Sequence, residues 1–238
     1  SQGCKHCYAE RLFPRAYAGQ MVDTCRVCNG KGCTKGCGKG TIVPEPRRFT
    51  DVMTHLDRLD QPLRWRKPRR VFVNSMSDLF HDDVPDDFIA QVFAVMAGAW
   101  QHTFQILTKR PERMREVIIS LGLPGLEHVW LGTSVEDAAV LSRLDDLRAT
   151  PAIVRFVSFE PLIGSVGGAN LDNIHWAIVG GESGPRARPM DEKWVDEIRL
   201  NCLASDTAFF FKQWGGRNKK AAGRTYRERT WDELPRVQ

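Results

Sequence analysis

The chain has 238 residues, of which 42% are hydrophobic and 26% charged, so its composition is that of a globular protein with material for a sizeable core. No stretch approaches the about 18 consecutive apolar residues of a membrane-spanning helix, so we expect no membrane partner. The formal net charge of +5 permits a nucleic-acid partner without requiring one.

The cysteines are concentrated near the start of the chain. Six of the seven lie between Cys4 and Cys37, and only Cys202 stands elsewhere. A secreted scaffold would spread disulfides through its fold, whereas clustered thiols in a reducing compartment are typical metal ligands. We therefore expect a cytoplasmic protein with metal sites, and the start at Ser1, without methionine or a secretory leader, suggests an N-terminally incomplete chain.

The first motif is Cys4-x2-Cys7 followed directly by Tyr8. It resembles the last two cysteines of the Cys-x3-Cys-x2-Cys loop of radical S-adenosylmethionine enzymes. The resemblance implies a [4Fe-4S] cluster on Cys4, Cys7 and a third cysteine upstream, with S-adenosylmethionine as cofactor and an electron donor as partner. A zinc site and a redox dithiol remain alternatives for this pair.

A second cysteine group lies in a glycine-rich stretch, which we expect to be a zinc-knuckle insertion at residues 22–41 of a single domain spanning residues 1–238. Tetrahedral zinc needs four soft ligands on a chain that can turn sharply, and the glycines permit such turns. Residues 25–32 resemble one Cys-x-x-Cys-x-Gly-x-Gly unit of DnaJ-type zinc modules. There are three alternatives: free thiols, an iron-sulfur role, and a four-cysteine zinc ribbon formed by Cys4, Cys7, Cys25 and Cys28. The four predicted zinc ligands are Cys25, Cys28, Cys33 and Cys37.

A basic segment follows. Its cations flank a tryptophan that could stack on a base, which makes the segment a candidate nucleic-acid contact, with a plain solvated surface as the alternative. A second basic group lies between Arg217 and Arg229. The candidate contacts are Arg64, Trp65, Arg66, Lys67, Arg69 and Arg70.

From Val71 onward, short β-branched or aromatic runs alternate with helical segments. We expect strands at 71–73, 104–107, 129–131, 153–157, 176–179 and 209–211. Helices are expected after a cap at Asp86-Asp87, from Pro111, and from a cap at Asp191. This alternation predicts an α/β fold with a parallel sheet, as a full or partial TIM-like (β/α) barrel, with an open doubly wound sheet as the alternative.

Every predicted strand ends in hydrogen-bonding residues, as expected if the carboxyl ends of the strands share one site. Lys109, Glu160 and Lys212 are the candidates for catalysis or substrate binding. Gly180-Gly181-Glu182 would let a ligand approach the backbone and accept from its ammonium group, although a glycine turn capping a helix is an alternative. The remaining candidates for cofactor contacts are Asn74, Ser75 and Asp78.

Several longer motifs together resemble a phage-associated, uncharacterised three-Cys-motif family. They are Cys4 to Glu10, Leu63 to Pro68, Phe72 to His81, Leu107 to Glu112 and Val179 to Gly184. The strand order of that family is similar to radical S-adenosylmethionine barrels, although in those enzymes a Gly-Gly-Glu element follows the second strand rather than a late one.

Two functions follow from these patterns. The first is a radical S-adenosylmethionine-like iron-sulfur enzyme, in which the cluster passes one electron to the cofactor and the resulting radical abstracts hydrogen from a substrate at the barrel rim. A nucleotide or nucleic acid is one candidate substrate. The second is a non-catalytic, zinc-stabilised nucleic-acid-binding protein.

Overall fold

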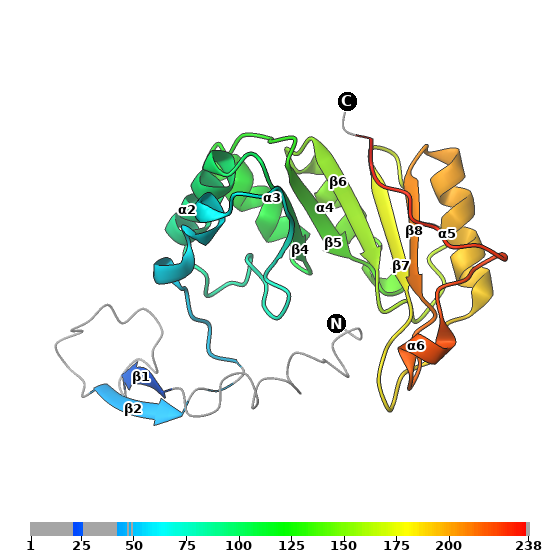
Figure 1. Cartoon of the computed structure of the whole chain (residues 1–238), viewed down its shortest axis with the longest axis horizontal. Coiled ribbons are helices and arrows are strands. Elements are labelled where there is room, and N and C mark those ends of the chain that lie inside the picture. The colour runs from blue at the N-terminus through cyan, green and yellow to red at the C-terminus, as the bar shows by residue number, and fades with distance from the viewer. Residues whose placement is uncertain (1–20, 26–41, 47, 49, 237–238) are drawn as a thin grey trace.

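The computed structural model describes residues 21–25, 42–46, 48 and 50–236. Within them, parallel strands form a six-stranded sheet in the order β3-β4-β5-β6-β7-β8 (Figure 1). All six predicted strands are confirmed. Their bounds are β3 Arg70–Val73, β4 Thr103–Thr108, β5 Val129–Ser134, β6 Val154–Phe159, β7 Trp176–Gly180 and β8 Ala208–Gln213.

The helices between these strands begin close to the predicted residues. Pro111 occupies the first turn of its helix, and Asp191 caps the last long helix by accepting from the Lys193 amide at 2.9 Å. The cap predicted at Asp86-Asp87 is wrong, because both residues lie inside the first turn of the helix. Their negative charges there interact favourably with the positive end of the helix dipole. The main helices are α2 Asp86–Gly98, α3 Pro111–Ser120, α4 Arg143–Ala149 and α5 Glu192–Ala204; short helical segments are η2 Leu56–Arg58, η3 Gln61–Arg64, η4 Ala138–Val140 and α6 Lys219–Ala222.

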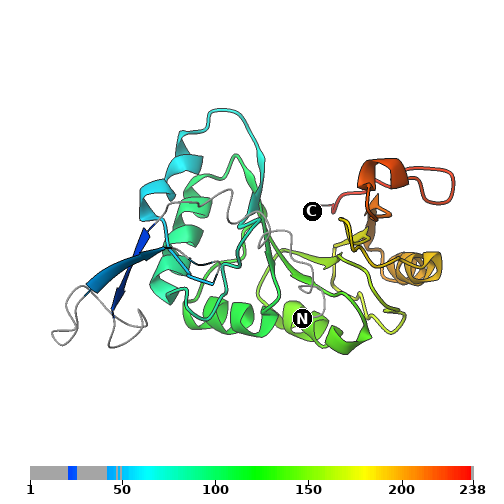
Figure 2. The same ribbon diagram turned by 90° about the horizontal axis from the view of Figure 1, so that it is seen from below.

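The sheet curls into a half-barrel, with α2, α3, α4 and α5 along its outer side (Figures 1 and 2). Each strand pairs with the next one in the chain. An open doubly wound sheet needs a reversal of strand order and helices on both faces, so that alternative is wrong. The predicted partial barrel is confirmed for the described residues, and β3 and β8 are its two edges.

The two faces of the sheet have different roles. Outer residues such as Ile106 and Val157 join the main core with the apolar stripes of the helices. Inner residues form a smaller aromatic layer in which Trp176 contacts Trp130 and Phe156, with ring centroids 5.8 and 5.9 Å apart. This alternation follows from the two-residue period of a strand, and it decides which side chains reach the concave side.

The segment after β8 closes that edge of the sheet. Trp231 and Tyr226 pack on Phe209, and the Trp231 carbonyl accepts from the Phe211 amide at 3.0 Å. Part of the second basic group is engaged here, since Arg227 pairs with Asp196 at 2.7 Å. These cations therefore help to fix the C-terminal segment.

A short antiparallel hairpin, β1 Met21–Cys25 with β2 Ile42–Pro46, frames the cysteine-rich insertion. Cys25 is paired with Ile42, so the chain leaves and re-enters the hairpin at one point. Cys4, Cys7, Tyr8, Cys28, Cys33 and Cys37 lie outside the described residues. The metal ligands and the insertion therefore stay predictions.

Candidate functional site at the carboxyl ends of the strands

The carboxyl ends of the parallel strands meet at one edge of the half-barrel (Figure 1). Lys109 and Glu160 directly follow β4 and β6, and Lys212 lies near the end of β8. The alternation of side chains along a strand places all three on the inner side of the sheet. Because a curled sheet points its inner side chains toward a common space, these residues line one surface. We call this surface, with Ser134, Glu136, Ser158 and Arg143, the inner rim.

Glu136 is the most buried charge of the inner rim, with 2% of its side chain exposed. It pairs with Lys109 through one oxygen and with Arg143 at 3.0 Å through the other. Arg143 also donates to the Ser134 carbonyl at 2.8 Å. Two cations offset the cost of burying this carboxylate, and it holds the Lys109 ammonium in place.

Glu160 and Lys212, two of the predicted catalytic residues, are brought together from β6 and β8. Their Oε2 and Nζ atoms lie 3.1 Å apart, and Ser158 lies 3.4 Å from the same oxygen. Lys212 is 54% exposed and Glu160 only 19%. The ammonium is therefore accessible to a ligand, and the carboxylate beneath it can orient that ammonium or accept from a ligand itself.

Close packing of the surrounding protein requires glycine at both position 180 and position 181. A Cβ on Gly181 would lie 2.0 Å from the Trp214 carbonyl oxygen, and one on Gly180 would lie 2.5 Å from Glu160 Oε1. The chain does not enter a helix until Glu192, so the alternative of a helix-capping turn is wrong. The two glycines let β7, the Trp214 backbone and Glu160 approach closely.

Glu182 is 6% exposed and is held by Arg188. The Arg188 amide and Nε both donate to Oε2 at 2.9 Å, and Nη2 donates to Oε1 at 2.9 Å. This hydrogen bonding raises the pKa of Arg188. Because Glu182 is almost fully buried and both of its oxygens accept from Arg188, the geometry makes it an anchor for Arg188.

Asp78 anchors the loop after β3 onto the end of β4. Its oxygens accept from the Phe80 amide at 3.0 Å, the Thr108 hydroxyl at 2.7 Å, the Lys109 amide at 3.2 Å and Arg110 at 3.1 Å. Both oxygens of this predicted cofactor contact are thus already used within the protein.

Asn74 and Ser75 begin the same loop. Asn74 has φ of 59°, in the left-handed region that Asn tolerates better than most residues. Its amide donates to Ser77 Oγ at 2.7 Å. The loop therefore presents the Asn74–Ser77 pair in a fixed arrangement.

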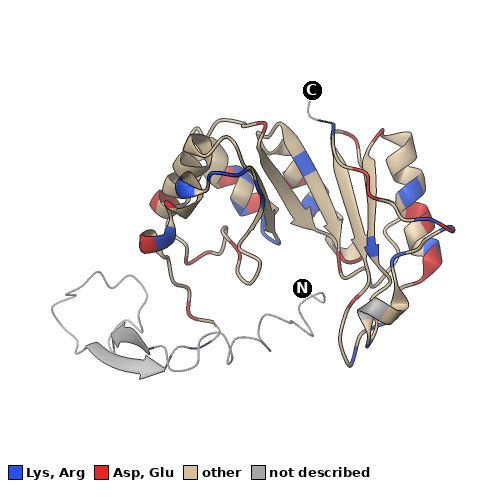
Figure 3. Ribbon diagram, viewed as in Figure 1, with Lys and Arg blue, Asp and Glu red and all other residues tan. Residues whose placement is uncertain are grey.

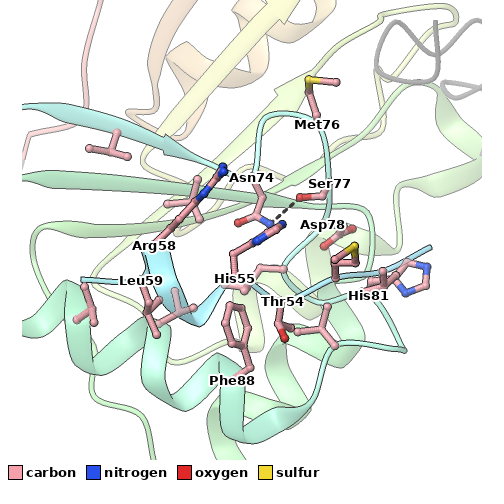
Figure 4. Close-up of a pocket in the computed structure, with 18 of the residues that line it drawn as sticks. Thr54, His55, Arg58, Leu59, Asn74, Met76, Ser77, Asp78, His81 and Phe88 are labelled. Atoms are coloured by element: carbon pink, nitrogen blue, oxygen red, sulfur yellow. Dashed lines mark hydrogen bonds between the residues drawn. The ribbon is translucent and has the colours of Figure 1, made fainter. Parts of the chain in front are cut away.

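A pocket of about 610 Å³ lies beside the edge strand β3 and was not predicted (Figure 4). It is bounded by residues 50–65, the 74–81 loop and α2. Asn74, Ser77 and Asp78 line it together with His55 and Arg58, which belong to no motif. Sequence reasoning had no signal for it, because residues 50–59 show neither helical nor strand periodicity.

The basic segment lies at the amino-terminal end of β3, away from the inner rim (Figure 3). Arg64 pairs with Asp60, and Arg69 lies over the Trp65 ring at 4.7 Å. In the described part of the chain, Arg66, Lys67 and Arg70 are exposed without an ion pair. The structure therefore separates the predicted nucleic-acid contacts from the predicted catalytic residues.

Among the described residues, no group of three or more His, Cys, Asp or Glu side chains is arranged to hold a metal ion. In the same part of the chain, no helix is both long and apolar enough to cross a bilayer.

Residues 1–235 match the model of a family described as proteins of unknown function, DUF5131, and the chain belongs to this uncharacterised domain family. No curated protein and no solved structure matches it. The inner rim and the pocket are therefore the basis for assigning a function.

Proposed function

We propose that this member of the family is a radical S-adenosylmethionine-like iron-sulfur enzyme whose substrate binds at the inner rim. The observation that carries the proposal is the convergence of Lys109, Glu160 and Lys212 on the concave side of a parallel half-barrel. Carboxyl ends of barrel strands are where such folds place their reaction sites.

A buried hydrogen-bond donor on the inner face of the sheet, the side-chain amide of Gln105, also bears on the proposal. Gln105 lies between Phe72 and Trp130 in the strand register, and its side chain is on the same face as Trp130. It is 8% exposed, and its buried Nε2 has no hydrogen-bond partner among the residues that the structure describes. Because buried donors are nearly always satisfied, this atom favours a further group on the concave side.

Within this proposal, the described residues bind and orient the substrate. Lys212 offers ammonium hydrogens beyond the one directed at Glu160, which suits a carboxylate or phosphate. Lys109 is 29% exposed and is held by the buried Glu136, so its charge is pre-positioned for the same substrate. Cys4 and Cys7, with a third thiolate, would hold the cluster, which supplies a reducing electron when bound.

Four of the residues predicted to contact S-adenosylmethionine do not fit that role as they stand. Glu182 is committed to Arg188, Asp78 to the end of β4, and the Gly180-Gly181 backbone to Trp214 and Glu160. We therefore assign no step to these residues. The cofactor stays in the proposal on the strength of the Cys4-x2-Cys7-Tyr8 motif.

Anaerobic reconstitution of the full-length protein tests the proposal. We expect four irons per chain, a broad absorption near roughly 400 nm typical of cysteine-ligated clusters and, with dithionite as the electron source, release of 5′-deoxyadenosine and methionine from S-adenosylmethionine. Cys7→Ser should abolish all three, whereas Cys202→Ser, in a buried helix position, should keep the iron. Failure to load iron would refute the iron-sulfur assignment, and loading without cofactor cleavage would refute the radical part.

A zinc-bound insertion is the second part of the proposal. The β1–β2 hairpin brings Cys25 and Ile42 together, which favours an independent loop closed by the metal. Cys25, Cys28, Cys33 and Cys37 are the proposed ligands. One zinc per chain, retained in Cys7→Ser and lost in Cys28→Ser, is expected; loss in both variants would favour the shared ribbon.

The second candidate function is nucleic-acid binding without catalysis. Exposed Arg66, Lys67 and Arg70, unpaired in the described part of the chain, favour it. Binding through such contacts should weaken steeply with salt, because phosphate contacts release counterions. Absence of binding to single- and double-stranded DNA and RNA at low salt would exclude this candidate.

A further inference from the structure

The pocket beside β3 is separate from the inner rim. Its walls include Phe88, Val92 and Met96 of α2 and Phe104 of β4, which all belong to the core on the outer, helix-covered face of the sheet. Phe72, on the inner face of the edge strand, also lines the pocket, but none of the inner-rim residues belongs to its lining. A ligand in this pocket would therefore occupy a second site.

The apolar part of the pocket can hold a planar aromatic or heterocyclic ring. Its lining includes flexible methionines and an aromatic ring, Met53, Met76 and Phe88, which adapt to planar ligands. The volume of about 610 Å³ falls in the range of small-molecule sites, roughly 300–1,000 Å³.

The polar groups of the pocket are suited to an acidic ligand. Arg58 and His55 line it, and within the described ranges their ion-pair contacts are both with Asp57, at 3.8 Å for Arg58 and 3.7 Å for His55. Asp57 is 72% exposed, so water weakens both contacts. A ligand phosphate or carboxylate can replace this partner at little cost.

A hydrogen-bonding edge is present as well. Because Asn74 donates its amide to Ser77, its carbonyl oxygen and the Ser77 hydroxyl hydrogen stay available as an adjacent acceptor and donor. Asp78 holds this loop on the end of β4 through four hydrogen bonds, so the edge is formed before any ligand binds. An acceptor beside a donor matches the edge of a heterocyclic base.

We propose that this pocket binds an organic anion about the size of a nucleoside monophosphate. The heterocycle packs against Phe88, its polar edge meets Asn74 and Ser77, and its phosphate or carboxylate meets Arg58 and His55 (Figure 4). This site does not depend on the iron-sulfur proposal, because no cysteine and no inner-rim charge takes part.

Calorimetry with the protein free of iron tests the site. The probes are adenosine monophosphate, adenosine, and indole-3-acetate, which replaces the phosphate by a carboxylate. Of the two acidic probes, we expect the one that binds more tightly to bind at least about tenfold more tightly than adenosine. The reason is that adenosine cannot make a charge-assisted contact to Arg58. The ranking of the two acids identifies the acidic group, and absence of binding by both in the millimolar range would overturn the proposal.

Two variants locate the binding. Arg58→Gln should weaken the acids about tenfold and leave adenosine unchanged, and Leu59→Trp should block all probes by filling the pocket. Arg236→Gln removes the same charge from an exposed position outside the pocket lining and outside both basic groups, and it serves as the control. Equal weakening by Arg236→Gln, or unchanged binding by Leu59→Trp with a normal melting temperature, would refute the site. Met76→Trp replaces Leu59→Trp if the latter does not fold.

Discussion

Removal of the Asp78 carboxylate should loosen both the inner rim and the pocket. Asp78→Ala deprives the Phe80 and Lys109 amides, the Thr108 hydroxyl and Arg110 of their acceptor. At about 1 kcal/mol for each bond, with some donors regaining water, the free energy of unfolding should fall by about 2–4 kcal/mol. For a domain of this size, the melting temperature should drop by roughly 5–10 °C.

Asp82 provides a matched control in the same loop. Its carboxylate is 74% exposed and lies 3.8 Å from Arg110, so Asp82→Ala should change the free energy of unfolding by less than about 0.5 kcal/mol. The loss of unfolding free energy in Asp78→Asn should lie between those of Asp78→Ala and Asp82→Ala. In this variant Oδ1 still accepts hydrogen bonds, but the side-chain NH2 group faces the Lys109 amide. Urea unfolding measures all three. Equal effects of Asp78→Ala and Asp82→Ala would refute the anchoring role.

Three further predictions concern other parts of the fold. Gly181→Ala should destabilise by more than about 2 kcal/mol in urea unfolding, since its Cβ would meet the backbone oxygen of Trp214 at 2.0 Å and neither strand can yield cheaply; a near-neutral result would refute the close packing. Burial lowers the pKa of His175, and Arg155 lowers it further, so the unfolded state binds the proton more readily. Stability from His175 should be full above the ordinary pKa and decline as pH falls below about 6.5, a trend that His175→Gln should flatten. Burial raises the pKa of Cys202 to about 12, so peptide mapping should find it unalkylated by iodoacetamide at neutral pH in the folded protein and alkylated in urea.

The strand and helix order could be predicted because each element has a strong local pattern. Ile89, Val92, Phe93 and Met96 follow the spacing of a one-faced helix, and all are buried. The strand boundaries shift by one to three residues at polar ends such as Thr108, where hydrogen bonds to neighbouring strands extend the ladder beyond the apolar run. The same alternation predicts a parallel sheet but leaves a partial barrel and an open doubly wound sheet as alternatives, and only the observed strand order decides between them.

The pairing of charges at the inner rim could not be predicted in the same way. The sequence indicates Lys109, Glu160 and Lys212 as strand-end residues, but their partners depend on strand register and loop path. Glu136 reaches Lys109 from β5, and Lys212 reaches Glu160 across β7. These contacts join residues that are far apart in the chain, where local patterns carry no information.

The Gly180-Gly181-Glu182 motif shows why a motif needs its structural context. Its residue types suit an ammonium-binding site, yet the same types suit close backbone packing and an anchored guanidinium. The distances decide between these uses, because a Cβ at either glycine would collide with protein atoms and Glu182 already holds Arg188. At this end of the sheet, the two glycines therefore serve close backbone packing, and Glu182 serves to anchor Arg188.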